Sequence, residues 1–322
     1  MRQIRLVAAF AAGLACAGPA KASDCLNPDA LGTARTLAVD PAAFARVGGM
    51  QYPHTLPLEK KEVMLTFDDG PMPPMTTKVL EALANECVRA TFFLIGRNAK
   101  SYQAIVQRIA ADGHTIANHS ENHFLTAQHG PNGVREFDKG FATISAALAP
   151  SGVSAAPFFR FPGLLNTHAV ESHAKAKGVS VMSADLLADD WTGINANQVL
   201  QRALLRLDQK GSGILLLHDV QPATALALPN LLRELKKRGY RVVHMVPAPG
   251  AGAPPPPMPE PLVAEKQPPA PARKVATRAA PKKPEAETVA DFPVLARWRK
   301  MMEQRKGAVV STSYPGNDNG GH

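Results

Sequence analysis

Short apolar runs recur along the middle of the chain, and segments with helical spacing separate most of them. The runs have the length of buried strands. They lie at 63–67, 90–95, 114–117, 158–161, 179–183, 213–217 and 241–245. Repeated strand–helix units predict a parallel sheet. Seven strands within about 185 residues indicate an α/β fold, a small and incomplete barrel related to the (β/α)8 type.

The intervening segments carry apolar residues three or four positions apart, which is the spacing of one buried helix face. We expect helices over 76–86, 98–111, 132–149, 197–208 and 222–238. Thr76 or Thr77 would cap the first of them. The last ends in Lys236-Lys237-Arg238-Gly239, a cationic final turn followed by glycine, which is typical of a helix end.

The two flanks differ from the central region 61–246. Residues 23–60 contain scattered Pro and Gly with little periodicity, and we expect an extension wrapped on the core. Residues 247–322 are rich in Pro, Ala and Lys and predict a disordered tail. A basic helix at 292–305 within this tail would contact a cell wall, a membrane surface or a protein partner, and a solvated tail is the alternative.

The first 22 residues have the pattern of a secretory signal, which is removed from the mature protein. Two arginines give a positive start, residues 6–17 form an apolar stretch too short to span a bilayer, and Ala20-Lys21-Ala22 is a small-x-small cleavage site. We therefore expect export to the periplasm or the extracellular space, with no transmembrane segment. A lipid-modified Cys16 is an alternative, and a buried N-terminal helix fits the flanks less well.

Removal of this segment leaves two cysteines, Cys25 and Cys87. An even number in an oxidising compartment predicts one disulfide bond between them. It would tie the extension to the core and stabilise the fold by about 2–4 kcal/mol. Two separate buried thiols are the alternative.

The charge balance is basic, with 36 Lys and Arg against 27 Asp and Glu and a net charge of +9. Such a balance favours anionic surroundings. No nucleic-acid-binding motif accompanies it, so we expect no nucleic-acid partner and interpret the charge as a surface property. The hydrophobic content of 45% is sufficient for a packed core.

Residues that carry chemistry follow the expected strands at their carboxyl ends. In a barrel these ends share one face, so the side chains converge there. The set comprises Asp68 and Asp69, His119 and His123, Arg160, then Asp185, Asp189, Asp190 and Trp191, and finally His218 with Asp219.

Two adjacent carboxylates and a His-x-x-x-His pair are the parts of a divalent-metal site with one carboxylate left to act as a base. A helix over 119–123 would place both imidazoles on one face. Singly, each residue has a structural explanation: Asp-Asp-Gly-Pro is often a turn, and His218 after an apolar strand is often a core histidine. Their joint occurrence at strand ends indicates metal-assisted hydrolysis.

These residues resemble the five motifs of the NodB-type polysaccharide deacetylases, carbohydrate esterase family 4. The motifs are carried by Asp68-Asp69, the His119/His123 pair, Arg160-Phe161-Pro162, Asp190-Trp191 and Leu216-Leu217-His218. The resemblance covers 61–246, with near-complete matches in the first two motifs and looser ones in the third and fourth. It implies a distorted (β/α)7 barrel, the NodB homology domain.

The resemblance also implies a metal site and a base. Asp69, His119 and His123 would bind one divalent cation, in the first place zinc, with Co²⁺ or Ni²⁺ as alternatives. Asp68 would be the general base, and Arg160 would hold it ionised and oriented.

For the second half of the reaction, the resemblance implies that His218 is the general acid. Asp190 would raise the pKa of His218 and fix its tautomer. Leu216 and Trp191 would form walls of the pocket for the acetyl methyl group.

The chain departs from the family pattern at two places. Gly163 stands where the family usually has an aromatic residue whose backbone N–H helps to form the oxyanion hole; glycine keeps the N–H but removes one wall of the groove. The fourth motif has a longer approach, which makes Asp185 a rival to Asp190 as the partner of His218.

We therefore expect an exported, metal-dependent hydrolase that removes N-acetyl groups from an amino-sugar polymer and releases acetate. Chitooligosaccharide, peptidoglycan and exopolysaccharide are the candidate substrates. An O-acetyl esterase acting on a xylan-like polymer is one alternative, and a non-catalytic wall-binding or scaffold protein is another.

Overall fold

The computed structural model describes residues 25, 27–125 and 130–251. The expected signal at 1–22, most of the expected tail and its helix at 292–305 lie outside the described residues, so these expectations stay predictions. All described residues belong to one compact unit.

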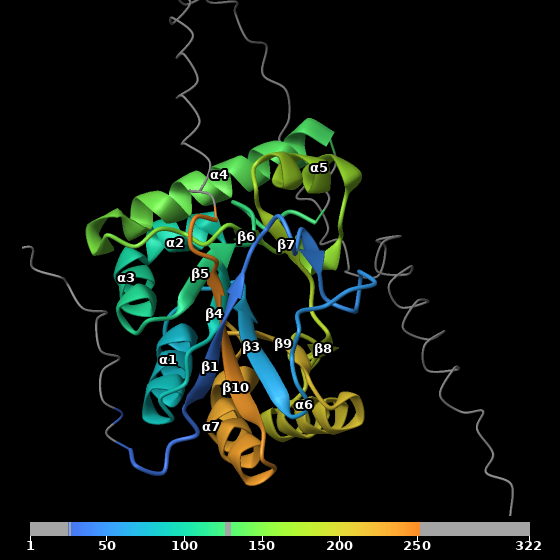
Figure 1. The fold of residues 1–322 in the computed structure, drawn as a ribbon. Helices are drawn as coiled ribbons and strands as arrows, with labels where there is room; N and C mark the ends of the chain where they lie inside the picture. The colour runs from blue at the N-terminus through green and yellow to red at the C-terminus, as the bar shows by residue number, and fades with distance from the viewer. Residues whose placement is uncertain (1–24, 26, 126–129, 252–322) are drawn as a thin grey trace, which may run out of the picture. The chain divides into compact units, whose positions relative to one another are not determined.

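The seven predicted strands are all present and form a curved parallel sheet (Figure 1). They are β3 (Glu62–Asp68), β4 (Thr91–Leu94), β5 (Thr115–Asn118), β6 (Phe158–Phe159), β7 (Ser180–Met182), β9 (Gly213–His218) and β10 (Arg241–Pro247). β3 is central because it pairs with β9, β4 and β10. A short strand that the sequence did not predict, β8 (Leu186–Leu187), pairs with β9.

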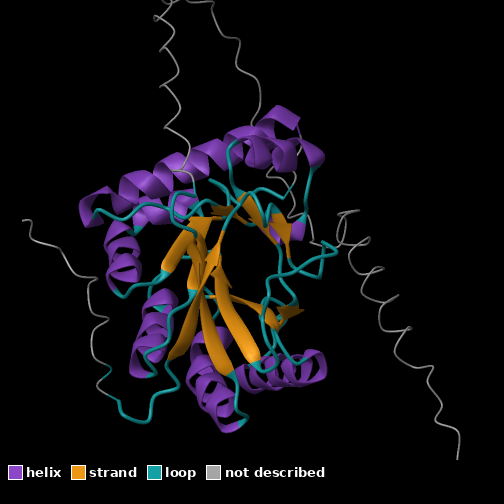
Figure 2. Cartoon of the chain, in the orientation of Figure 1, coloured by secondary structure: helices purple, strands orange, loops and turns teal. Residues whose placement is uncertain are grey.

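Helices cover the outside of the sheet (Figure 2). They are α1 (Met75–Asn85), α2 (Gly96–Ser101), α3 (Gln103–Ala111), α4 (Gly130–Leu148), α5 (His168–Ala176), α6 (Ala196–Lys210) and α7 (Pro222–Lys237), with short 3₁₀ turns η2 (Ala149–Ser151) and η3 (Pro162–Leu164). The single helix predicted over 98–111 is two, because Tyr102 has non-helical dihedral angles. The predicted cap at Thr76 or Thr77 was wrong, since α1 begins at Met75. α5 was not predicted.

The N-terminal extension is more ordered than its sequence suggested. It forms β1 (Thr33–Val39) and β2 (Arg46–Val47), which pair in parallel with β10 and β7 respectively. Along β1 the partly buried positions alternate with exposed ones, so the strand has a period of two that its mixed composition obscures. The extension therefore adds a strand at both ends of the sheet order.

Side-chain alternation along the strands divides the core into two clusters. Val63, Leu65 and Phe67 of β3 pack with residues of the helices, whereas Met64 packs with other strand residues such as Phe93. Because successive side chains of a strand point to opposite faces, Asp68 lies on the Met64 side, inside the barrel. The same alternation carries Arg160 inward after Phe158, and His218 inward after Ile214 and Leu216.

The predicted disulfide bond is present between Cys25 and Cys87, with 5.8 Å between the Cα atoms. It joins the start of the extension to the segment directly after α1. No helix among the described residues is long and apolar enough to cross a membrane.

Candidate metal centre and active site

Asp69, His119 and His123 come together at the carboxyl ends of β3 and β5. One ligand atom from each residue lies within 4.8 Å of the other two. Asp69 Oδ1 is 3.4 Å from His119 Nε2 and 3.1 Å from His123 Nε2. The sequence prediction that these three residues could share one cation is therefore compatible with their positions.

A turn, not a helix, brings the two histidines together. Ser120 and His123 both have left-handed backbone conformations, with φ of 70° and 60°. The His123 N–H donates a hydrogen bond to Ser120 Oγ at 3.0 Å, which closes the turn. The two imidazole centroids are 5.0 Å apart, so this turn brings the pair together without the helix that would also have placed them on one face.

The donor set fits a divalent metal ion. His119 Nδ1–H donates to the Arg160 carbonyl at 2.8 Å, which leaves the lone pair of Nε2 facing Asp69. Asp69 Oδ1 is buried and has no hydrogen-bond partner among the described residues. Burial raises the pKa of Asp69, but the neighbouring His119 and His123 outweigh it and hold that pKa well below its ordinary value. Two imidazoles and a carboxylate leave further coordination positions open, as catalytic zinc sites require.

Asp68 contacts a buried guanidinium through Oδ1, while its Oδ2 lies 3.8 Å from His119 Nε2 of the triad. Arg160 is fully buried, and its Nη1 donates to Asp68 Oδ1 at 2.8 Å and to Thr66 Oγ1 at 2.9 Å. The other guanidinium nitrogens donate to the backbone carbonyls of Met182 and Ser183. Burial lowers the pKa of Arg160, and the charge and hydrogen bond of Asp68 raise it. Both aspartates thus lie near His119, but only Asp68 is hydrogen-bonded to Arg160, and only Asp69 lies close to both imidazoles.

Asp190, and not Asp185, contacts His218. Asp190 Oδ1 lies 2.8 Å from His218 Nδ1, and Oδ2 accepts the His218 N–H at 2.7 Å and the Thr224 hydroxyl. Asp185 instead accepts hydrogen bonds from the N–H of Gly49 and from Thr55 and Ile214, so it ties the extension to the sheet.

His218 is poised as a cation beside the triad. Its Nε2 is 4.0 Å from Asp69 Oδ2. Burial lowers the pKa of His218, but the hydrogen bond and charge of Asp190 and the charges of Asp69 and Asp68 raise it to about 9. The imidazole can therefore hold a proton at neutral pH and deliver it to a leaving group.

The three predicted pocket residues lie around these groups. The Trp191 ring packs edge-on against His218, with centroids 5.4 Å apart. Leu216 is buried in register with Thr66. Gly163 is exposed in η3 with φ of 59°, and a Cβ there would come within 3.0 Å of Leu125 Cδ2. Leu125 thus occupies space that the sequence prediction left open as a missing wall.

Sequence reasoning missed several supporting residues. Thr66 orients Arg160, and the strand alternation could have indicated it, since it lies between Met64 and Asp68 on the inner face. Asp219 was noted only as the neighbour of His218. It is fully buried, its Oδ2 accepts from Thr76 Oγ1 at 2.6 Å, and burial raises its pKa to about 7.

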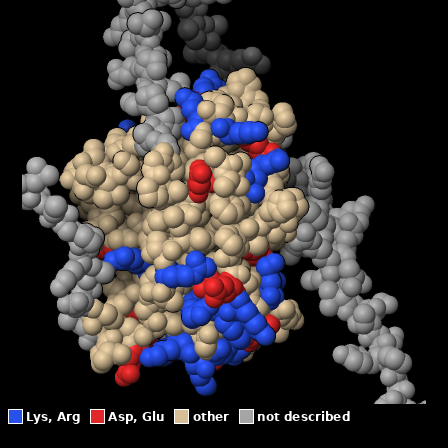
Figure 3. All heavy atoms as spheres, in the orientation of Figure 1, with Lys and Arg blue, Asp and Glu red and all other residues tan. Residues whose placement is uncertain are grey.

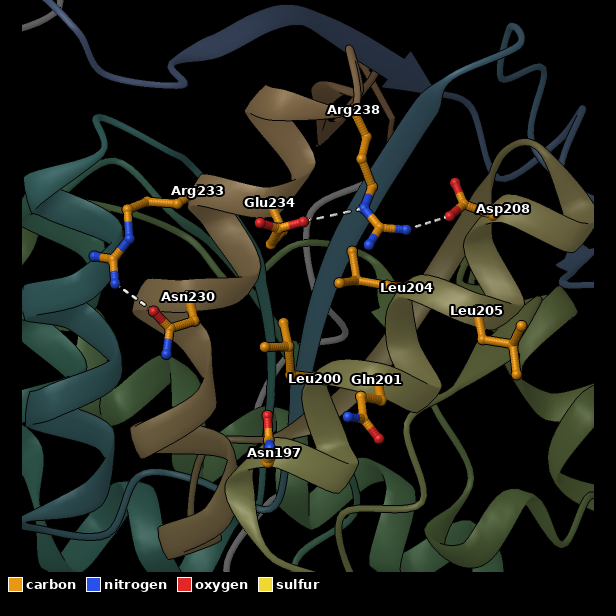
Figure 4. Close-up of a pocket in the computed structure, with 10 residues that line it drawn as sticks. All are labelled: Asn197, Leu200, Gln201, Leu204, Leu205, Asp208, Asn230, Arg233, Glu234 and Arg238. Carbon is orange, nitrogen blue, oxygen red and sulfur yellow. Dashed lines mark hydrogen bonds and ion pairs between the residues drawn. The ribbon is translucent and has the colours of Figure 1, made fainter.

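A surface groove between α6 and α7 lies apart from these residues. Figure 4 shows its apolar floor and a chain of ion pairs from Glu234 through Arg238 to Asp208. None of the metal-binding or acid–base candidates lines it. Basic side chains gather near this end of the molecule on the face drawn in Figure 3. Basic residues of the chain also form ion pairs with acids, such as Lys61 with Asp208 and Arg241 with Glu59.

Comparison with known proteins gives concordant matches. The family model described as polysaccharide deacetylase matches residues 55–182. A peptidoglycan-N-acetylglucosamine deacetylase from Bacillus cereus is 31% identical over 197 residues, covering 58% of this chain and 88% of that protein. A chitooligosaccharide deacetylase from Bradyrhizobium is 30% identical over 203 residues, covering 58% and 90%. The solved structure of a Bdellovibrio bacteriovorus peptidoglycan deacetylase superposes with a TM-score of 0.56 at 31% identity, covering 66% of this chain and 59% of that one.

Proposed function

Since the chain belongs to the polysaccharide deacetylase family and is therefore a hydrolase, we propose that it removes N-acetyl groups from an amino-sugar polymer. Each turnover consumes one water molecule and yields a free amine and acetate. The observation that carries this proposal is the division of labour between Asp68 and Asp69. One carboxylate faces two imidazoles and the other faces a buried guanidinium.

Asp69, His119 and His123 would hold the divalent cation. We propose zinc, because it favours imidazole and carboxylate ligands with an open position, and Co²⁺ or Ni²⁺ are alternatives. When bound, such a cation polarises an acetyl carbonyl and lowers the pKa of water. The hydrogen bond from His119 Nδ1 to the Arg160 carbonyl fixes the tautomer that leaves Nε2 free as a ligand.

Asp68 acts as the general base. It takes a proton from the attacking water molecule while the oxygen of that water bonds to the acetyl carbon. Arg160 orients the carboxylate through the 2.8 Å hydrogen bond and stabilises its charge. The carbonyl oxygen gains negative charge in the transition state, and the backbone N–H of Gly163 stabilises it.

His218 then protonates the leaving nitrogen as the carbon–nitrogen bond breaks. The hydrogen bond and charge of Asp190 raise the pKa of His218, which favours the protonated imidazole. Asp190 receives the Nδ1 hydrogen bond, so Nε2–H is the proton that is delivered. Trp191 and Leu216 exclude water on either side and leave a small apolar space for the acetyl methyl group.

We infer that the substrate is a cell-wall or related extracellular polymer of N-acetylglucosamine. The relatives named above act on peptidoglycan and chitooligosaccharides, and these are the first two candidates. The Cys25–Cys87 disulfide bond supports an oxidising compartment and hence export. We propose residues 61–246 as the catalytic domain, with 23–60 as an extension packed on it.

The test is acetate release by the zinc-loaded protein from N-acetylglucosamine oligomers, peptidoglycan and O-acetylated xylan. Asp68→Asn should lower kcat by about 10²–10⁴-fold, the usual contribution of a general base, and still bind metal. Asp112→Asn, which removes a surface ion pair with Arg108, is the matched control and should leave kcat unchanged. Release from xylan alone would make the protein an esterase. No release from any polymer would favour a binding protein.

A further inference from the structure

On the premise of this deacetylase reaction, we propose that the N-terminal segment 46–52 is part of the catalytic apparatus, with Gln51 as the positioning residue of the turn that contains Gly163. The segment comprises β2 and the turn that follows it. The family match begins at residue 55, so this contribution comes from outside the matched region.

The turn at Gly163 has an unfavourable backbone conformation that needs support. Gly163 and Leu164 are both left-handed, with φ of 59° and 55°. Glycine adopts this region freely, but in Leu164 the Cβ atom crowds the backbone. A non-glycine residue keeps such a conformation only where its surroundings over-determine it. The contacts around Leu164 therefore decide how firmly the turn is held.

The N–H groups of the turn have different partners. Leu164 N–H donates to the Phe161 carbonyl at 2.9 Å, and Leu165 N–H donates to the Pro162 carbonyl at 3.1 Å. Gly163 is near the start of this 3₁₀ turn, where helical geometry supplies no acceptor. Its N–H can thus serve a substrate carbonyl, provided that the turn keeps its orientation.

Gln51 holds the C-terminal side of the turn. Its Nε2 donates to the Leu164 carbonyl at 2.5 Å and to Asn166 Oδ1 at 3.2 Å. Asn166 in turn donates to Glu171 Oε1, which also accepts the hydroxyl of Tyr52 at 2.8 Å. Gln51 and Tyr52 thus anchor the turn and the start of α5 from the same side.

The segment is itself fixed against the backbone that holds Arg160. Ser183 N–H donates to the Val47 carbonyl at 2.7 Å, and the Ser183 carbonyl accepts from Arg160 Nη2 at 2.9 Å. Gly48 has φ of 109°, and a Cβ there would come within 2.6 Å of the Ser183 carbonyl carbon. This close approach requires glycine. One segment therefore sets the position of the base's partner, Arg160, and of the oxyanion donor, Gly163.

The test compares Gln51→Ala with Gln103→Ala in the zinc-loaded full chain. Gln103 is a matched control because its Nε2 also donates to a backbone carbonyl, that of Lys100, on a different part of the surface. We expect Gln51→Ala to lower kcat by about tenfold, less than deletion of an oxyanion donor, because the N–H is displaced and not removed. KM and the bound zinc should stay unchanged. Hydrogen–deuterium exchange should accelerate in the peptide 162–166.

A second variant guards against a folding defect in the first. Gln51→Glu keeps the shape but replaces the donor by an acceptor that faces the Leu164 carbonyl, so it should lower kcat at least as much. Unchanged kcat and exchange in both Gln51 variants, or equal losses in Gln103→Ala, would overturn the positioning role. A wild type that releases no acetate would instead overturn the deacetylase function on which this inference rests.

Discussion

The buried pair of Arg160 and Asp68 should be the most strongly coupled interaction of the site, and Arg160→Met tests it. The change keeps an unbranched apolar side chain over the Phe93 ring, which the guanidinium now covers at 4.0 Å. It leaves Asp68 buried without its charged partner, and it removes the donors to the Met182 and Ser183 carbonyls. Breaking a buried ion pair in this way costs about 3–5 kcal/mol of folding free energy.

The double variant Asp68→Asn/Arg160→Met removes both charges together and should recover part of this loss. What remains is the loss of three hydrogen bonds, those from Arg160 to the two carbonyls and to Thr66 Oγ1, each worth about 1 kcal/mol. The sum of the unfolding free energies lost in the two single variants should therefore exceed the loss in the double variant by at least about 1 kcal/mol, as expected for residues in contact. Kinetic losses should be similarly non-additive, because Arg160 acts through Asp68.

The assay is equilibrium urea unfolding at pH 7 with a chelator present, so that metal binding does not contribute to stability. Tyr52→Phe, which removes one hydroxyl hydrogen bond to Glu171, is a control for polar loss away from the base. Free-energy changes that add within about 0.5 kcal/mol would refute the reasoning, because independent sites behave in that way. Arg160 would then contribute by packing alone.

Three further predictions concern acid–base chemistry and the groove. Asp190→Asn removes the charge that raises the pKa of His218, so the alkaline limb of the pH profile of kcat/KM should move to lower pH. A shift of this limb in Asp185→Asn but not in Asp190→Asn would contradict the assignment of Asp190 as the partner of His218. Burial lowers the pKa of His114 to about 3, below its unfolded value of about 6.5, so the stability that the neutral imidazole contributes is complete above pH 6.5 and falls as the solution is acidified. In urea unfolding, the wild type should therefore lose about 2 kcal/mol of stability between pH 7 and pH 5 that His114→Gln retains. Equal losses in the two proteins would exclude His114 as the cause. Leu125→Ala removes the side chain next to Gly163 and should raise KM for oligomers about fivefold with little change in kcat. Leu226→Ala, at an exposed position of α7, is the control and should leave KM unchanged. A fall in kcat alone would assign Leu125 another role.

The strand ends of the site were predictable because apolar runs of strand length alternate with segments of helical spacing along the sequence. Each chemical motif follows an apolar run, and parallel strands present their carboxyl ends on one face. Alternation within β3 then directs Asp68 inward, where it contacts Arg160, the residue directly after β6, while Asp69 follows the end of β3. The local path of the chain was less predictable. The His119–His123 spacing is compatible with a helical turn, yet the left-handed Ser120 and His123 form a loop of the same reach.

The extension shows where such periodicities stop being informative. β1 pairs with β10 about 200 residues later, and β2 has two residues, too few for any pattern to register. The bond from Gln51 to the Leu164 carbonyl spans 113 positions and joins two turns. Its one local sign is the pair Gly48-Gly49, because adjacent glycines often mark a close backbone approach. Residues placed by strands should therefore govern metal binding and proton transfer, whereas Gln51 should govern only the geometry of the oxyanion donor. Substitutions of the residues placed by strands should accordingly change zinc affinity or the pH profile, whereas substitutions of Gln51 should change kcat alone.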